Sequence, residues 1–138
     1  MKVHLMRMRI VMVTLWIPHV TAKTQLLADL GHMVTEQDDM EKAESLVRQR
    51  AFDLLIADLR VCFGYGASEL RRTVVDGNVH ALIMCPFGTQ AANRRFQAIV
   101  APSEIARIRY HGCGASRDMQ RFRRRISEIE IERFRMAG

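Results

Sequence analysis

Asp58 is the residue of this 138-residue chain that is best placed to do chemistry. It closes the run Phe52-Asp53-Leu54-Leu55-Ile56-Ala57-Asp58, which has the length and apolar content of one buried strand. Open α/β sheets bind their ligands at the C-terminal ends of such strands. The run therefore predicts a site at one edge of a parallel sheet. The alternative is a strand-end carboxylate that only pairs with an arginine or a loop amide.

The cysteines and histidines are weaker candidates for redox or metal-binding chemistry. Cys62, Cys85 and Cys113 are odd in number and lack paired spacing, which is typical of reduced thiols in a cytosolic protein. Cys62 and Cys85 are expected near the same sheet edge, so a thiol switch is one alternative to their acting as small hydrophobic residues. His111-Gly112-Cys113 is too sparse for zinc, which needs four ligands, so we predict no metal site.

Composition limits the function classes. A chain of this length with 49% apolar residues fits one domain with a real core. The net charge of +6 favours an acidic partner without naming it. No apolar run approaches the length of a membrane span, so we expect no membrane association and a cytoplasmic location. No catalytic triad or acid–base pair is recognisable, and Gly64-Tyr65-Gly66 lacks the lysine of phosphate-binding loops, so we predict no enzymatic activity.

Strand-length apolar runs alternate with segments of helical period, which predicts a parallel sheet with crossover helices. Asp38 and Glu41 form a capping-box pair before the second helix, and Ala22 shares an apolar face with Leu26 and Leu27 in the first. The predicted strands are 9–16, 32–36, 52–59, 80–85 and 103–109, and the predicted helices are 19–30, 40–50, 67–75, 89–100 and 116–136, with a turn at 76–78.

The order of the predicted elements and the spacing of several residues resemble those of the receiver domain of two-component response regulators, over nearly the full length of the chain. Asp58 stands at the phospho-accepting aspartate of that family, Gly66 at the glycine that ends the following loop, and Glu69-Leu70-Arg71-Arg72 resembles the next helix. The segment 26–34 resembles the first helix and second strand. The resemblance implies a flavodoxin-like (βα)5 doubly wound parallel sheet with strand order 2-1-3-4-5, in a single domain over residues 1–138.

The departures from the family pattern concern its active site. Receivers carry an acidic pair after the first strand to hold a divalent cation, and here Thr14 and Leu15 stand at those positions. Cys85 replaces the Ser/Thr at the end of the fourth strand. The lysine after the fifth strand has no lysine counterpart, although Arg107 or Arg109 falls nearby. We therefore expect an atypical receiver with weak or absent Mg²⁺ binding and no cofactor.

The residue pattern of the last predicted helix indicates an interaction surface. An apolar stripe lies opposite seven arginines, and the late apolar residues Ile131 and Phe134 leave that stripe. Receivers commonly dimerise through this helix, so we expect a homodimer, with four interface candidates: Met119, Phe122, Ile131 and Phe134. Acidic residues interrupt the basic run, so nucleic-acid binding by the helix itself is the weaker hypothesis.

The sequence thus predicts a signalling module that acts through protein partners. It is expected to be the N-terminal regulatory part of a transcription regulator, with helix 116–136 leading to an output domain through which any nucleic acid would be bound. Two alternatives stay open: a receiver that still accepts a phosphoryl group at Asp58, and a flavodoxin-like protein that binds a small ligand. A polar cavity above the first and third strands would favour the ligand.

Overall fold

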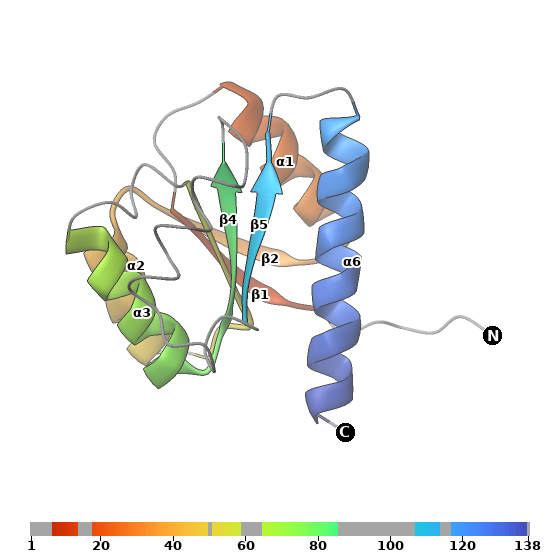
Figure 1. The fold of residues 1–138 in the computed structure, drawn as a ribbon. Helices are drawn as coiled ribbons and strands as arrows, with labels where there is room; N and C mark the ends of the chain where they lie inside the picture. The colour runs from red at the N-terminus through yellow and green to blue at the C-terminus, as the bar shows by residue number, and fades with distance from the viewer. Residues whose placement is uncertain are drawn as a thin grey trace.

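Five parallel strands form one sheet in a computed structural model of the chain (Figure 1). The structure describes residues 7–13, 18–49, 51–58, 65–85, 107–113 and 117–137. The elements in chain order are β1 (Arg9–Val13), α1 (Pro18–Asp29), β2 (Met33–Gln37), α2 (Met40–Gln49), β3 (Leu54–Asp58), α3 (Tyr65–Gly77), β4 (His80–Cys85), β5 (Ile108–Gly112) and α6 (Asp118–Ala137).

The strand order is β2-β1-β3-β4-β5, which confirms the predicted doubly wound arrangement. Every neighbouring pair is parallel, so the carboxyl ends of all five strands lie at one edge of the sheet. β3 and β4 are buried along their whole length, as expected for central strands that are covered on both faces. Asp58 is therefore carried to the carboxyl edge by the most buried part of the fold.

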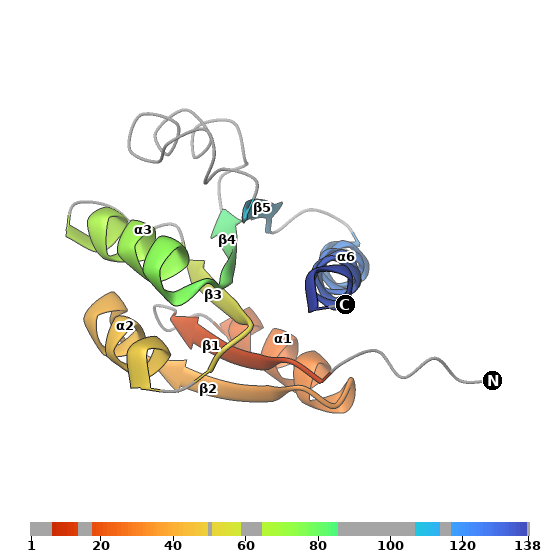
Figure 2. The same ribbon diagram turned by 90° about the horizontal axis from the view of Figure 1, so that it is seen from below.

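Helices cover both faces of the sheet (Figure 2). One apolar cluster joins α2 and α3 to alternate residues of the strands, and the other joins α1 and α6 to the remaining residues. This division follows from the two-residue period of a strand, because neighbouring side chains point to opposite faces. From α6 the second cluster takes Phe122, Ile126 and Ile129, which confirms most of the apolar stripe predicted for that helix.

The start of α2 differs from the predicted capping box. Asp39, not Asp38, caps the helix: its Oδ1 accepts a hydrogen bond from the Lys42 backbone N–H at 2.8 Å. Asp38 instead binds the Lys42 ammonium at 2.9 Å on the exposed surface. Both acids lie before the helix in the sequence, and only the backbone geometry decides which one reaches the amide.

The fifth strand was predicted too early. It spans Ile108–Gly112 and pairs with β4 from Ala81↔Ile108 to Cys85↔Gly112, whereas the sequence pattern predicted 103–109. As an edge strand it is only partly buried, and its polar residues Arg109 and His111 obscured the strand pattern. The predicted helix 89–100 lies outside the described residues.

The third helix is longer than predicted at both ends. It runs through Gly77, so the expected turn at 76–78 is reduced to Asn78, which adopts a left-handed conformation with φ of 51°. Asparagine tolerates this conformation better than most residues do. Among the described residues, none of the helices is both long and apolar enough to cross a membrane.

Charged contacts fix the C-terminal half of α6 to the amino edge of the sheet. Arg133 binds Asp53 at 3.0 Å, and the other Asp53 oxygen accepts the Arg9 backbone N–H at 2.9 Å. Glu130 lies 2.7 Å from Nε2 of His32, both side chains being almost wholly buried. The position of α6 therefore depends on polar contacts as well as on its apolar stripe.

His80 is buried at the start of β4, and neither of its ring nitrogens has a hydrogen-bond partner among the described residues. Burial lowers its pKa below the usual 6.5, with Glu132 opposing this effect and Arg133 adding to it. The ring is therefore neutral in the folded protein and gains a proton more easily in the unfolded chain.

We predict that acidification destabilises the fold partly through His80. Because the folded pKa lies below the unfolded value, stability is full above about pH 6.5 and falls by up to about 1.4 kcal/mol per pH unit as the pH drops toward the folded pKa. His80→Leu should flatten the acid limb in urea unfolding at several pH values. Parallel pH curves for both proteins would contradict the assignment.

Candidate functional site at the carboxyl edge

Asp58 is the last residue of β3 and is 1% exposed. It lies in register with Met84 of β4, and the preceding Ala57 lies opposite Val13, the last residue of β1. The structure thus places Asp58 where the sequence predicted it, at the carboxyl edge between the first and fourth strands. Thr14 and Leu15 follow Val13 in the sequence and lie outside the described residues.

Cys85 ends β4 as predicted, but its thiol belongs to the core. It is fully buried in the α2–α3 cluster and its Sγ donates to the Ile83 carbonyl at 3.5 Å. Burial raises the pKa of Cys85 to about 11, with Cys113 adding to the effect. The thiol is therefore protonated at neutral pH and a poor nucleophile. Cys113 packs against the α1–α6 cluster on the other face, a poor arrangement for a disulfide, and Cys62 lies outside the described residues.

Neither arginine near the fifth strand takes the place of the family lysine. β5 ends at Gly112, so Arg107 precedes the strand and Arg109 is its second residue. Arg107 donates to the Asn78 side chain at 3.1 Å, near the start of β4, and Arg109 binds Glu132 of α6 at 2.6 Å. Both guanidinium groups are thus held away from the carboxyl edge, so neither of the two arginines near β5 stands in for the family lysine.

A charged network that the sequence analysis missed lies at this edge. The Lys23 side chain, from α1, is 0% exposed, and its Nζ lies 2.9 Å from Oδ2 of Asp118 at the start of α6. The other Asp118 oxygen, Oδ1, lies 2.5 Å from Nε2 of His111 in β5. The Lys23 ammonium also lies 5.7 Å from the centroid of the Phe122 ring. Asp118 therefore joins a cation from one helix to an imidazole from the edge strand.

Burial shifts the ionisation of this network. It lowers the pKa of His111, although the Asp118 carboxylate acts in the opposite direction. For Asp118 burial acts to raise the pKa, but the hydrogen bonds from Lys23 and His111 outweigh it and the pKa is lowered. At neutral pH the network is thus a carboxylate between an ammonium group and a neutral imidazole, with Nε2–H donating to Asp118.

Helical periodicity could have revealed Lys23. Ala22 was predicted on the buried face of α1, but it is exposed, and Lys23, one turn before the buried Leu27, takes the inner position. Lysine is rarely fully buried without a partner, so its place on this face requires a counterion. The partner, Asp118, is 95 residues away in the sequence. No local pattern connects the two.

The four interface candidates divide between core and surface. Phe122 is fully buried against the sheet, so its prediction as an interface residue was wrong, and Met119 is only half-exposed. Ile131 and Phe134 are 41% and 54% exposed. Ile131 also lines a groove of about 400 Å³ beside β5, together with Arg109, Glu128, Glu132 and Arg135.

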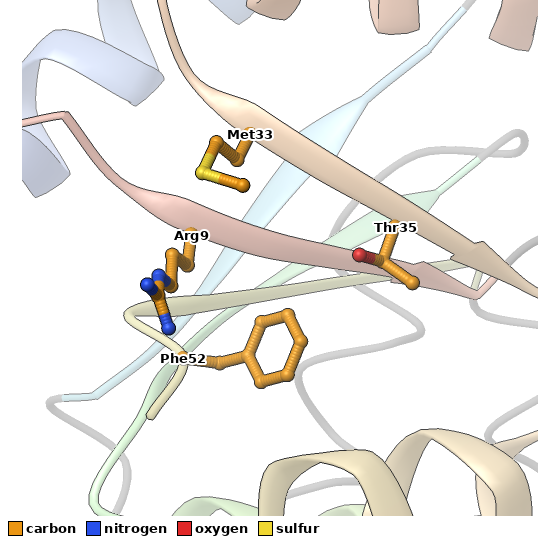
Figure 3. A pocket seen from close by; sticks show the side chains of 4 residues that line it. All are labelled: Arg9, Met33, Thr35 and Phe52. Atoms are coloured by element: carbon orange, nitrogen blue, oxygen red, sulfur yellow. The ribbon is translucent and has the colours of Figure 1, made fainter. Parts of the chain in front are cut away.

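A second pocket opens at the amino edge of the sheet. Arg9, Met33, Thr35 and Phe52 line its volume of about 400 Å³, with Arg9 and Met33 opposite each other on β1 and β2 (Figure 3). These residues come from the starts of the strands, at the end remote from Asp58. The pocket therefore does not supply the cavity above β1 and β3 that the small-ligand alternative requires.

No family model and no curated protein matches the chain. Solved receiver domains do match in structure. A signal receiver domain of an HD domain-containing protein from Pseudomonas fluorescens Pf-5 has a TM-score of 0.63 at 18% identity, covering 92% of this chain and 99% of that one. A response regulator receiver protein from Burkholderia phymatum has a TM-score of 0.67 at 16% identity, with 90% and 95% covered.

A third match is the receiver domain of a sensor histidine kinase from Pseudomonas aeruginosa PAO1, with a TM-score of 0.62, 20% identity, and 86% and 97% of the two chains covered. That structure holds a magnesium ion in its active-site cleft. The chain has the receiver fold. These similarities confirm the fold that the sequence resemblance implied, and they extend over nearly all of each chain.

We predict that Asp118 stabilises the fold by compensating the buried ammonium of Lys23. Asp118→Asn leaves that charge without a counterion and should lower the free energy of unfolding by about 3–5 kcal/mol, measured in urea. Lys23→Met combined with Asp118→Asn should recover most of the loss, because no unpaired charge then remains buried. Equal stability of Asp118→Asn and the unmodified protein would contradict this role.

Proposed function

We propose that the chain is a non-enzymatic regulatory module of receiver type that acts through protein contacts, with Mg²⁺-dependent phosphorylation of Asp58 weak or absent. One observation carries the proposal: Asp58 ends the third strand of a receiver fold, but the sequence provides no carboxylate at the end of the first strand. The fold supports the regulatory class, and the missing carboxylates support the departure from phosphorylation.

The sequence that follows β1 and the described residues near the carboxyl edge do not suit a magnesium ion at Asp58. Mg²⁺ requires oxygen ligands in near-octahedral geometry and is usually held by one or two carboxylates plus waters and substrate oxygens. Threonine and leucine follow β1 at positions 14 and 15, and Asp118 is already bonded to Lys23 and His111. Without the cation, the charge of an incoming phosphoryl group would be poorly compensated beside Asp58.

The other two family positions point the same way. Cys85 has its thiol bonded inside the α2–α3 core, where it is a weak donor for a phosphoryl oxygen. Arg107 and Arg109 are engaged with residues away from the carboxyl edge, so neither supplies the cation expected after β5. A receiver that keeps its fold and loses these groups would signal by binding rather than by phosphoryl transfer.

The outer end of α6 is the proposed contact surface. Figure 1 shows the last turns of this helix extending beyond the starts of the strands. Ile131 and Phe134 are exposed there, next to a groove lined by charges of both signs. Apolar side chains framed by ion-pairing groups are suited to a symmetric contact between two copies of the chain. We therefore propose a homodimer formed through this surface.

We further propose that the chain is the regulatory part of a transcription regulator. Nucleic acid would then be bound by an output domain. A cytoplasmic location follows from the same role. The runner-up functions are phosphoryl acceptance at Asp58, favoured by its position at the end of β3, and binding of a small ligand by a flavodoxin-like protein.

We predict that the protein gains no stable phosphoryl group from acetyl phosphate with Mg²⁺, because the cation has too few carboxylate ligands at Asp58. Intact-mass measurement tests this. A mass gain of one phosphoryl group that is lost in Asp58→Asn would overturn the proposal in favour of a working phospho-acceptor.

A gain-of-function variant serves as the control for this experiment. Thr14→Asp with Leu15→Asp would bring two further carboxylates to the residues that follow β1, so a folded variant should acquire Mg²⁺ affinity in a calorimetric titration. Unchanged Mg²⁺ binding in a variant that retains its circular dichroism spectrum would count against Thr14 and Leu15 as the acid-pair positions.

We predict a dimer at micromolar concentration that depends on the outer end of α6. Ile131→Ser with Phe134→Ser should weaken it by on the order of 1–3 kcal/mol per side chain, because each loses apolar area buried between the copies. Sedimentation equilibrium measures the change.

Met33→Ser is the matched control, since Met33 is the most exposed large apolar residue described, at 62%, and lies on the edge strand β2. It should leave the dimer unchanged. A monomer at all accessible concentrations, or equal weakening by the control, would remove the proposed surface.

A further inference from the structure

Three metal-ligating side chains converge at the junction of β5 and α6. His111 and Cys113 are two residues apart at the end of the edge strand, so their side chains point to the same face. Asp118 begins α6 on that face. One ligand atom from each residue lies within 4.8 Å of the others. His111 and Cys113 alone are too sparse for a metal ion, as predicted from the sequence, but the fold brings Asp118 to them as a third ligand.

The surroundings of the three side chains resemble those of metal sites in proteins, where the ligands are held by hydrogen bonds and packing. Ligating carboxylates are usually hydrogen-bonded through their second oxygen, and Oδ2 of Asp118 is bound by the fully buried Lys23 while Oδ1 faces His111. The His111 ring is held edge-on against Phe122, with centroids 5.6 Å apart. The Cys113 thiol donates to the His111 carbonyl at 3.8 Å, and the Cys113 backbone N–H donates to the Cys85 carbonyl at 3.0 Å. Packing and hydrogen bonds thus orient all three side chains.

We propose that His111, Cys113 and Asp118 bind a borderline divalent metal such as Zn²⁺. An imidazole, a thiolate and a carboxylate suit zinc or cobalt and are a poor set for Mg²⁺, which prefers oxygen ligands alone. Three protein ligands leave a fourth position for water or for a group from a partner. Cys113 and Asp118 are partly exposed, so a path for the ion exists.

Metal binding would change the protonation of Cys113 and the tautomer of His111. The Cys113 thiol releases one proton to solvent and becomes the thiolate ligand. His111 stays neutral, but its proton moves from Nε2 to Nδ1, so that Nε2 can bind the ion in place of its present hydrogen bond to Asp118. The thiolate and carboxylate offset the two charges of the metal, and Lys23 keeps its bond to Oδ2. This ion would connect the edge strand directly to α6, the helix that carries the proposed contact surface.

The test is a Co²⁺ titration of the metal-free full chain without a histidine tag. We expect one equivalent of Co²⁺ to produce a thiolate-to-cobalt charge-transfer absorption that Zn²⁺ displaces and excess Mg²⁺ does not. Cys113→Ser should abolish the absorption. His111→Asn should weaken Zn²⁺ binding by more than about tenfold, since even outer-shell partners are worth about 10–100-fold. Circular dichroism shows whether each variant is folded.

Cys85→Ala is the matched control, because it removes a thiol on the opposite face of the sheet. It should retain the absorption. Absence of a charge-transfer band in the unmodified protein, a band that survives Cys113→Ser, or displacement by Mg²⁺ would each overturn the site. The result is independent of the phosphorylation experiment, because Asp58 is not among the ligands.

Discussion

Burial of a parallel sheet on both faces is the constraint on which the rest of this structure depends. β3 and β4 have no solvent-facing side, so every polar group that the strands carry must lie at an edge or find a partner inside. Asp58 lies at the carboxyl edge, and Asp53 lies at the amino edge, where it binds Arg133 of α6. The helices are held against the sheet partly by these edge contacts.

The last helix, α6, makes polar contacts with both edges of the sheet. Asp118 compensates the buried Lys23 at the carboxyl edge, and Glu130 and Arg133 bind His32 and Asp53 at the amino edge. An apolar stripe alone would allow the helix to slide along the sheet, because apolar packing has little directional preference. Ion pairs at two separated points remove that freedom. The exposed turn beyond Glu130 is thereby presented in one fixed position.

The carboxyl edge has the geometry of a receiver with a different set of chemical groups. The acids expected after the first strand are threonine and leucine in the sequence, and the fourth strand ends in a buried thiol. Among the described residues of this edge, Lys23, Asp118 and His111 meet between α1, β5 and α6. The receiver fold is thus combined here with a charged network between α1, β5 and α6.

The sequence by itself determined the sheet. Apolar runs at β1, β3 and β4 are long and uninterrupted, so their positions could be predicted, and Asp58 was correctly placed at a strand end. The strand order, which the structure confirms, was implied by the resemblance to receiver domains. The edge strand β5 was misplaced because Arg109 and His111 lie within it. Its pattern is weak because an edge strand has less apolar surface to bury.

Only the tertiary structure decided the charged network and the outer surface of α6. Lys23 and Asp118 are 95 residues apart, and no local pattern relates a lysine in one helix to the first residue of another. Phe122 was predicted both for the apolar stripe and for an interface, and only the packing decides that it lies in the core. Periodicity reports which face of an element is apolar, but contacts between elements depend on how the whole chain closes around the sheet.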